Sequence, residues 1–242
     1  MKSFKFILLF VLFLNFTITE IFAQYSLIDS FSDYSTYLSK SIDVSCKKPK
    51  NFIWETIRTS PKMQGSWERK MFVSSYIGKM QSKDGNYLIL YPNPIAAMLS
   101  TGKSSSLECG CNFVRRQMIY DMGKASEETL PSDLIDLVGE DIIRIVGKDV
   151  PFNADTVFIV QIPLKEPYLG KYTYCVGIYA CKSGRMPMGF KYYFTNEGKT
   201  REKESLLKFY ETIRYRNNNN WSYDHEKALK TLLYELPHKS KK

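Results

Sequence analysis

Cysteine is the residue type in this sequence with the widest choice of chemistry. The five cysteines are Cys46, Cys109, Cys111, Cys175 and Cys181. Cys109 and Cys111 flank Gly110, and a bridge between them would close a small, strained ring. We therefore expect a disulfide bond from this pair outward, to Cys46, Cys175 or Cys181. The alternatives are a thiol redox role for Cys109 and Cys111, a zinc site completed by a third cysteine, and reduced, buried thiols.

Cys175 and Cys181 are not expected to bond each other. On one continuous strand their Cα atoms would lie about 20 Å apart, whereas a disulfide needs roughly 4.4–6.8 Å. The number of cysteines is odd. At least one thiol is therefore unpaired or bonds another chain.

A basic and aromatic segment is the candidate binding patch. Lys47, Lys48 and Lys50 directly precede Phe52 and Trp54. Clustered positive charge beside aromatic side chains can dock an anionic polymer or a membrane surface. The alternative is an ordinary solvated end of a strand.

Standard catalytic and metal-binding signatures are missing from the sequence. There is no G-x-G-x-x-G or G-x-S-x-G, and Ala97 occupies the first glycine position of a phosphate loop ending at Ser104. His225 begins an H-E-x-x-H pattern, but Leu229 replaces its second histidine. The carboxylates between residues 127 and 141 lack the order of a calcium loop. We assign no catalytic, cofactor-binding or metal-binding residues and expect no cofactor.

The N-terminal residues indicate export. Lys2 and Lys5 precede an apolar run over 6–16, and Ala23 ends a cleavage site before Gln24. This run is too short for a membrane span, which needs about 20 residues. We expect removal of residues 1–23 as a signal peptide, which leaves residues 24–242 secreted or periplasmic without a transmembrane segment. The alternatives are an uncleaved anchor and a buried core helix.

The elements that would position these residues follow an α+β pattern. Helical spacing of apolar residues predicts helices over 27–38, 112–123, 199–213 and from about 222 to 236. Strands are predicted over 42–46, 71–79, 87–91, 156–162, 172–181 and 188–195, and residues 52–57 should pack on the sheet. Hairpin turns are predicted at Gly85 and Gly184. We expect one α+β domain over 24–242, an antiparallel sheet flanked by helices, with a C-terminal helical extension from about residue 217.

Several stretches carry a resemblance to known proteins. FNADTVFIVQIPL at 152–164, KYTYCVGIYACKSGRMPMGFKYYFTNEGK at 171–199 and ETIRY at 211–215 resemble uncharacterised small exported proteins of Bacteroidetes. The FTNEGK–helix–IRY ending and DVSCKKPKNFIW at 43–54 are also similar to PsbP-like domains. The resemblance covers about residues 40–216. It implies an antiparallel sheet flanked by helices and an extracytoplasmic accessory or binding role, and it supplies no catalytic residue.

Composition and export together narrow the function. The chain is 44% hydrophobic and 24% charged, with a formal net charge of +9, which is typical of a folded protein rather than a disordered one. We expect an exported, non-catalytic binding or accessory protein of the cell envelope, whose partner is another envelope protein or an anionic envelope polymer and not nucleic acid. It would bind through a sheet face or the loop at 100–112. The alternatives are a periplasmic thiol-dependent enzyme or hydrolase, and a structural subunit of an envelope assembly.

Overall fold

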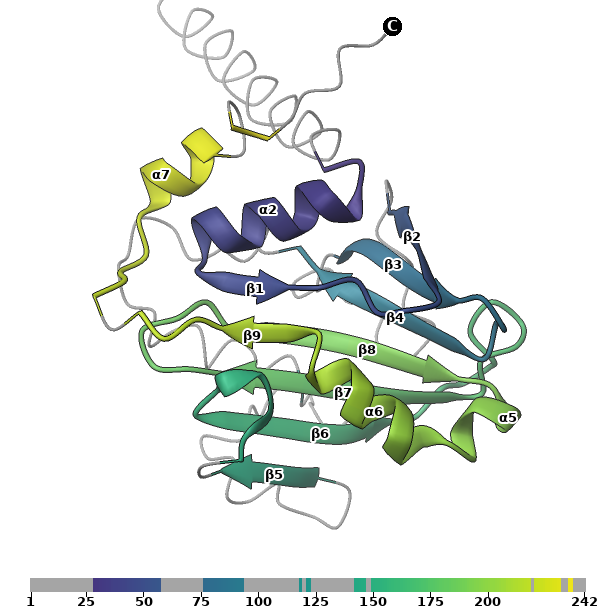
Figure 1. The fold of residues 1–242 in the computed structure, drawn as a ribbon. Helices are drawn as coiled ribbons and strands as arrows, with labels where there is room; N and C mark the ends of the chain where they lie inside the picture. Colours follow the sequence, from purple (N-terminus) through teal and green to yellow (C-terminus); the bar gives the residue numbers. More distant parts are fainter. Residues whose placement is uncertain are drawn as a thin grey trace, which may run out of the picture.

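The computed structural model describes residues 28–57, 76–93, 118, 121–122, 142–146, 149–218, 220–231 and 235–236. Over these residues the chain forms a seven-stranded antiparallel sheet in the order β2-β3-β4-β8-β7-β6-β5 (Figure 1). Its strands are β2 (Phe52–Thr56), β3 (Tyr76–Ser82), β4 (Tyr87–Pro92), β5 (Ile142–Val146), β6 (Thr156–Ile162), β7 (Tyr174–Cys181) and β8 (Met188–Phe194). A second, two-stranded sheet pairs β1 (Val44–Cys46) with β9 (Ile213–Tyr215).

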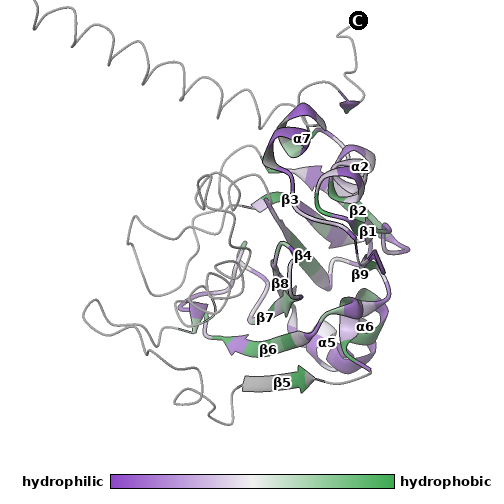
Figure 2. Cartoon of the chain, turned by 90° about the vertical axis from the view of Figure 1, so that its left-hand side faces the viewer, coloured by the Kyte–Doolittle hydropathy of each residue, from purple (hydrophilic) through white to green (hydrophobic). Residues whose placement is uncertain are grey.

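Helices complete the fold and confirm the predicted α+β class. They are α2 (Phe31–Ser41), α5 (Asn196–Lys199), α6 (Glu202–Tyr210) and α7 (His225–Lys230), with a short 3-10 turn η2 (Pro151–Asn153). The helices α2, α5, α6 and α7 lie on the same side of the large sheet (Figure 2). In the part of the chain described above, no helix is both long enough and apolar enough to cross a membrane.

Two hydrophobic cores lie on opposite faces of the large sheet. Successive side chains of a strand point to opposite faces, so in β8 Phe190 and Tyr192 point to the helix-covered face. There they pack on Phe209 of α6, with ring centroids 5.3 and 5.6 Å apart. Lys191 and Tyr193 of the same strand are buried on the other face.

The hairpin turns form as predicted, and the first helix, predicted over 27–38, forms a few residues later at Phe31–Ser41, for identifiable local reasons. Gly85 at φ 75° and Gly184 at φ 65° close the turns before β4 and β8, in a backbone region that favours glycine. Ser30 caps α2 by accepting a hydrogen bond from the Asp33 amide, while the Asp33 carboxylate accepts from the Ser30 amide. This capping box fixes where α2 begins and how the preceding chain enters it.

The single helix predicted over 199–213 is wrong. The chain forms α5 and then α6, which ends at Tyr210, and residues 213–215 pair with β1 as β9. Ile213 and Tyr215 are buried, and the Tyr215 hydroxyl donates to the Met186 carbonyl at 2.8 Å. A strand of three residues is too short for its alternation to stand out beside a helical repeat.

Several predictions fall wholly or partly outside the described residues. They concern the signal peptide at 1–23, Cys109, Cys111 and the loop at 100–112. Of the predicted helix over 112–123, the structure describes Met118 and Asp121, which are helical, and Met122, which is in a turn.

Candidate functional site

The predicted binding patch lies at one edge of the large sheet. Lys47, Lys48 and Lys50 are exposed in the connection between β1 and β2. Phe52 and Trp54 are half-buried in β2 and pack on the helix-covered core. Between α2 and β2 the surface forms an open groove of about 630 Å³, which we call the α2–β2 groove. Its lining residues are Asp29, Ser30, Phe31, Ser32, Ser35, Thr36, Lys48, Ile53 and Trp54.

The structure therefore brings together only part of the predicted patch. Lys48 and Trp54 line the α2–β2 groove, whereas Lys47, Lys50 and Phe52 lie beside it in the sequence and outside its lining. Sequence reasoning missed the contribution of α2, which supplies Phe31, Ser32, Ser35 and Thr36 to the lining of the groove. These α2 residues carry no chemical signature of their own, so only the packing of α2 against β2 reveals them.

Trp54 is held rigidly at this groove. Its ring lies 5.3 Å from Tyr34 in a stacked arrangement, and 5.6 and 5.5 Å from Phe31 and Tyr91 in edge-on arrangements. Its Nε1 donates to the Thr56 hydroxyl at 3.1 Å, which in turn donates to the Asp29 carbonyl at 3.0 Å. Aromatic packing of this kind provides a preformed apolar surface with its polar atom already satisfied.

β2 is an edge strand with a row of unpaired backbone groups. The Lys83 amide donates to the Asn51 carbonyl and the Ile57 amide donates to the Ile77 carbonyl, both at 2.8 Å. Hydrogen-bonded pairs alternate along an antiparallel ladder, so the amides and carbonyls of Ile53 and Glu55 also face β3. The amides and carbonyls of Phe52, Trp54 and Thr56 therefore face away from β3. Among the described residues, no other strand pairs with this side of β2.

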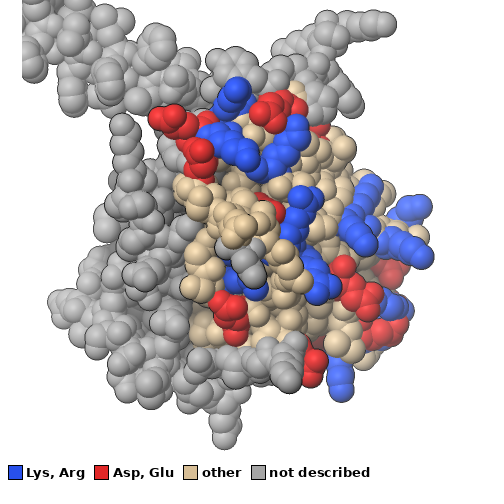
Figure 3. Space-filling view, turned by 60° about the vertical axis from the view of Figure 1, so that its left-hand side comes forward, with Lys and Arg blue, Asp and Glu red and all other residues tan. Residues whose placement is uncertain are grey.

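The three lysines beside β2 carry unneutralised charge. Over the described part of the chain, none of their ammonium groups has an ion-pair or hydrogen-bond partner. By contrast, Lys and Arg side chains are interspersed with Asp and Glu on the face shown in Figure 3. Among the carboxylates near the groove, Asp33 is engaged in the capping box of α2, Glu55 of β2 pairs with Lys79 at 2.9 Å, and Asp29 lines the groove itself. The groove therefore combines an aromatic surface with a positively charged flank.

The predicted disulfide bond is not formed at the cysteines that the structure describes. Cys46 and Cys175 are buried free thiols, and no disulfide joins any two of Cys46, Cys175 and Cys181. Cys175 and Cys181 lie near the two ends of the continuous strand β7, as their spacing predicted. Cys109 and Cys111 are outside the described residues.

The predicted bond from Cys109 or Cys111 does not reach Cys46 or Cys175 because each of these thiols is enclosed in a packed core, and the two cores also keep them from bonding each other. Cys46 belongs to the core on the helix-covered face, whereas Cys175 belongs to the core on the opposite face. A disulfide cannot reach through the sheet. Burial raises the pKa of the Cys46 thiol above its ordinary value and that of Cys175 to about 12. Both groups therefore stay protonated at neutral pH and are poor nucleophiles and metal ligands.

A buried polar cluster on the other face of the sheet escaped sequence reasoning. Lys191 of β8 is fully buried, and its ammonium group contacts both the Asp121 carboxylate and the Tyr179 hydroxyl. The Tyr179 hydroxyl also donates to Asp121. A lysine inside the apolar strand MGFKYYF was the available signal. Each of these groups has a partner within the cluster, which is what a buried charge requires to be tolerated.

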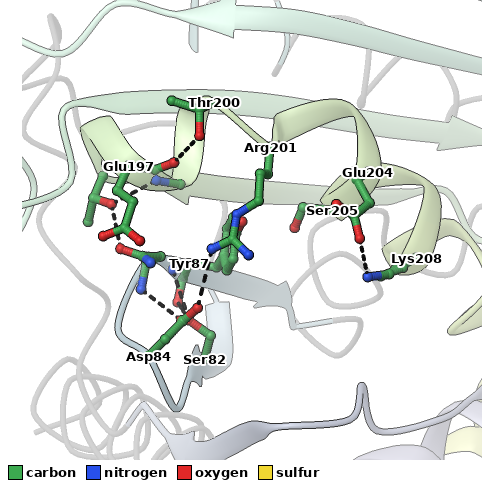
Figure 4. A network of polar contacts seen from close by, with 12 residues as sticks. Ser82, Asp84, Tyr87, Glu197, Thr200, Arg201, Glu204, Ser205 and Lys208 are labelled. Carbon is green, nitrogen blue, oxygen red and sulfur yellow. Dashed lines mark hydrogen bonds and ion pairs between the residues drawn. The ribbon is translucent and has the colours of Figure 1, made fainter.

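A second polar network surrounds Asp84 (Figure 4). Asp84 and Arg201 are exposed, whereas Ser82 and Asn86 are buried. The Ser82 hydroxyl donates to Asp84 at 2.6 Å and the Asn86 amide donates to the same carboxylate at 3.1 Å. Arg201, at the start of α6, lies 3.8 Å from Asp84. Partial burial acts to raise the pKa of Asp84, but these hydrogen bonds and the Arg201 charge outweigh it, so its pKa is lowered. The network links the β3–β4 turn to the helices that follow β8.

The site and fold together define an α+β protein with an open, aromatic and basic groove at a sheet edge. Comparison with protein-family models finds no match, and comparison with curated proteins finds none either. Within the described residues, no three His, Cys, Asp or Glu side chains come together as a metal site.

Proposed function

We propose that this protein is an exported, non-catalytic accessory protein of the cell envelope that binds an anionic partner at the α2–β2 groove. The observation that carries the proposal is the groove itself, which is lined both by the fixed indole of Trp54 and by Lys48. Lys47 and Lys50 add unneutralised charge at the same edge. Aromatic surface provides contact area, and the lysines attract and orient a negatively charged ligand.

The binding role is supported by the chemistry of the described thiols. Cys46 and Cys175 are buried and protonated, so neither supplies the thiolate that a thiol-dependent enzyme needs. That alternative therefore depends on Cys109, Cys111 and Cys181. Export is supported by the signal-peptide pattern at residues 1–23 and by the resemblance to exported Bacteroidetes proteins.

Binding of a labelled anionic polymer tests the proposal. Fluorescence anisotropy with fluorescein-labelled poly-L-glutamate would measure Kd for the purified full chain and for the variant Lys47→Gln/Lys48→Gln/Lys50→Gln. Exposed charge pairs contribute about 0.2–1 kcal/mol each. The loss of three such pairs in the triple variant corresponds to a rise in its Kd of roughly tenfold. This rise should become smaller as salt is added, because salt screens the charges.

The matched control removes the same charge from elsewhere on the surface. Lys165, Lys203 and Lys227 are exposed, lie outside the groove and have no ion pair within the described residues. The variant Lys165→Gln/Lys203→Gln/Lys227→Gln should bind poly-L-glutamate within about twofold of the unmodified protein. Equal weakening in both variants would mean that net charge alone, and not the groove, holds the polymer.

A further inference from the structure

The geometry of β2 points to the form in which the partner is held. We propose that β2 binds an extended acidic polypeptide segment by strand addition, so that the segment becomes the next strand of the large sheet. This inference rests on the function proposed above and names the class of partner for the same groove.

The backbone of β2 is prepared for such an addition. The amides and carbonyls of Phe52, Trp54 and Thr56 face away from β3, and among the described residues nothing pairs with them. An extended peptide can satisfy these groups at once, because one antiparallel or parallel ladder forms bonds at every second residue. Five residues of strand span about 17 Å, which sets the length of the segment held by β2.

The side chains around β2 offer two apolar contacts on opposite faces of the added strand. Trp54 and Phe31 lie on the side facing α2. Ile53 also borders the groove, but as the neighbour of Trp54 along β2 its side chain alternates toward the other face, and it is 58% exposed, the joint highest value among the large apolar side chains described. Side chains of a bound strand alternate between the same two faces. A segment of small β-branched residues would therefore cover both surfaces.

The charges next to β2 select an acidic segment over a second copy of this chain. Lys47, Lys48 and Lys50 lie immediately before β2 and lack partners among the described residues. A second copy would bring the same lysines and a formal net charge of +9 to the interface. Lysines beside an open edge are a known protection against pairing between copies. Carboxylates at the end of the segment next to these lysines would instead neutralise them.

Backbone N-methylation of a peptide provides the sharpest test. The probe is a fluorescein-labelled peptide of alternating valine and threonine over five residues, with three glutamates at one end; a second probe carries them at the other end. Each is made unmodified and in two methylated forms, with N-methyl groups on the odd or on the even residues of the strand segment. Only one of these two sets can face β2.

Strand addition predicts an unequal effect of the two methylation patterns. For the tighter of the two probes, one methylated form should bind at least about tenfold more weakly than the unmodified peptide, and the other within about twofold. If the unmodified peptide binds and its two methylated forms have equal affinities, strand addition is overturned. The groove would then remain an anionic docking site. If neither the peptides nor poly-L-glutamate bind, the proposed function fails as well.

A matched pair of variants tests the same point from the protein side. Proline in place of Phe52 removes an outward amide without removing a hydrogen bond to β3. Phe52→Ala loses the same ring but keeps the amide. One hydrogen bond contributes about 1 kcal/mol, so Phe52→Pro should bind the peptide about fivefold more weakly than Phe52→Ala. Equal affinity of the two variants, with melting curves that show both are folded, would contradict the inference.

Discussion

Replacing Gly78 with alanine should disturb the α2–β2 groove from within the sheet. Gly78 of β3 pairs with Thr56 of β2, and the Trp54 ring lies over it. A Cβ added at Gly78 would lie 2.0 Å from Cη2 and 2.1 Å from Cζ2 of Trp54. Non-bonded carbon atoms need about 3.5–4.0 Å, so the indole must move by roughly 1.5 Å.

The cost of that movement follows from what surrounds the ring. Phe31, Tyr34 and Tyr91 all have ring centroids within 5.3–5.6 Å of the indole, which leaves no open direction into the core. Overpacking of this kind costs about 1–3 kcal/mol. For a chain of this size, about 2 kcal/mol lowers the Tm by roughly 4–8 °C. Poly-L-glutamate binding should weaken in the same variant.

A double-mutant cycle assigns the cost to the contact between Gly78 and Trp54. Urea denaturation would give the free energy of unfolding for Gly78→Ala, Trp54→Ala and the double variant. Without the indole the added methyl group meets no obstacle, so Gly78→Ala should cost less than about 0.5 kcal/mol in the Trp54→Ala background.

The matched control is Gly189→Ala in β8. Its added Cβ would lie 3.2 Å from Tyr179, a milder contact on the other face of the sheet, away from Trp54. Its effect should be the same with and without Trp54. If Gly78→Ala costs the same in both backgrounds, the indole does not lie over Gly78 and our description of the groove is wrong.

Three further predictions concern the parts of the molecule outside the groove. Lys191→Met removes the cation that pairs with the buried Asp121 carboxylate and should lower the free energy of unfolding, measured in urea, by about 3–5 kcal/mol. Adding Asp121→Asn should restore much of this loss. An unchanged free energy of unfolding in Lys191→Met would refute the ion pair. Burial raises the pKa of Cys175 to about 12, so this thiol should resist iodoacetamide at pH 8 in the folded chain and react after denaturation. Peptide mapping by mass spectrometry measures the modification. Rapid modification of Cys175 in the folded chain would contradict its burial. Because the folded state lowers the pKa of Asp84, its stabilising effect is present above the unfolded value of about 3.9 and is lost as the pH falls through the folded value. Unfolding at pH 6 and pH 3 should therefore show a smaller acid loss for Asp84→Asn than for the unmodified protein, and equal losses would argue against the network around Asp84.

The strongest sequence patterns predicted the sheet well. Residues 156–162 form a nearly continuous apolar run and are the strand β6, and the turns at Gly85 and Gly184 lie where glycine permits a positive φ. The segment at 52–57 was predicted only to pack on the sheet, yet it forms the edge strand β2. An edge strand has one neighbour, and nothing in the sequence says how many neighbours a strand will have.

The candidate site could be predicted in part because its chemistry is concentrated in one segment. The Lys47–Trp54 segment showed its charge and aromatic character directly, whereas the serine and threonine side chains of α2 join the groove only through tertiary packing. The disulfide bond predicted from Cys109 or Cys111 is not formed at Cys46 or Cys175, because counting cysteines does not reveal which thiols are enclosed in a core. The alternation of β7 places Cys175 beside Tyr193 and away from Cys46.

Amide hydrogen exchange along β2 is the most direct measurement of the proposed site. In the free protein we expect fast exchange at the outward amides of Phe52, Trp54 and Thr56, and slow exchange at Ile53 and Glu55, which face β3. Saturation with the acidic peptide should slow exchange at the three outward amides. Outward amides that are already protected in the free protein, or that exchange equally fast when the peptide is bound, would contradict binding of an acidic segment at this edge.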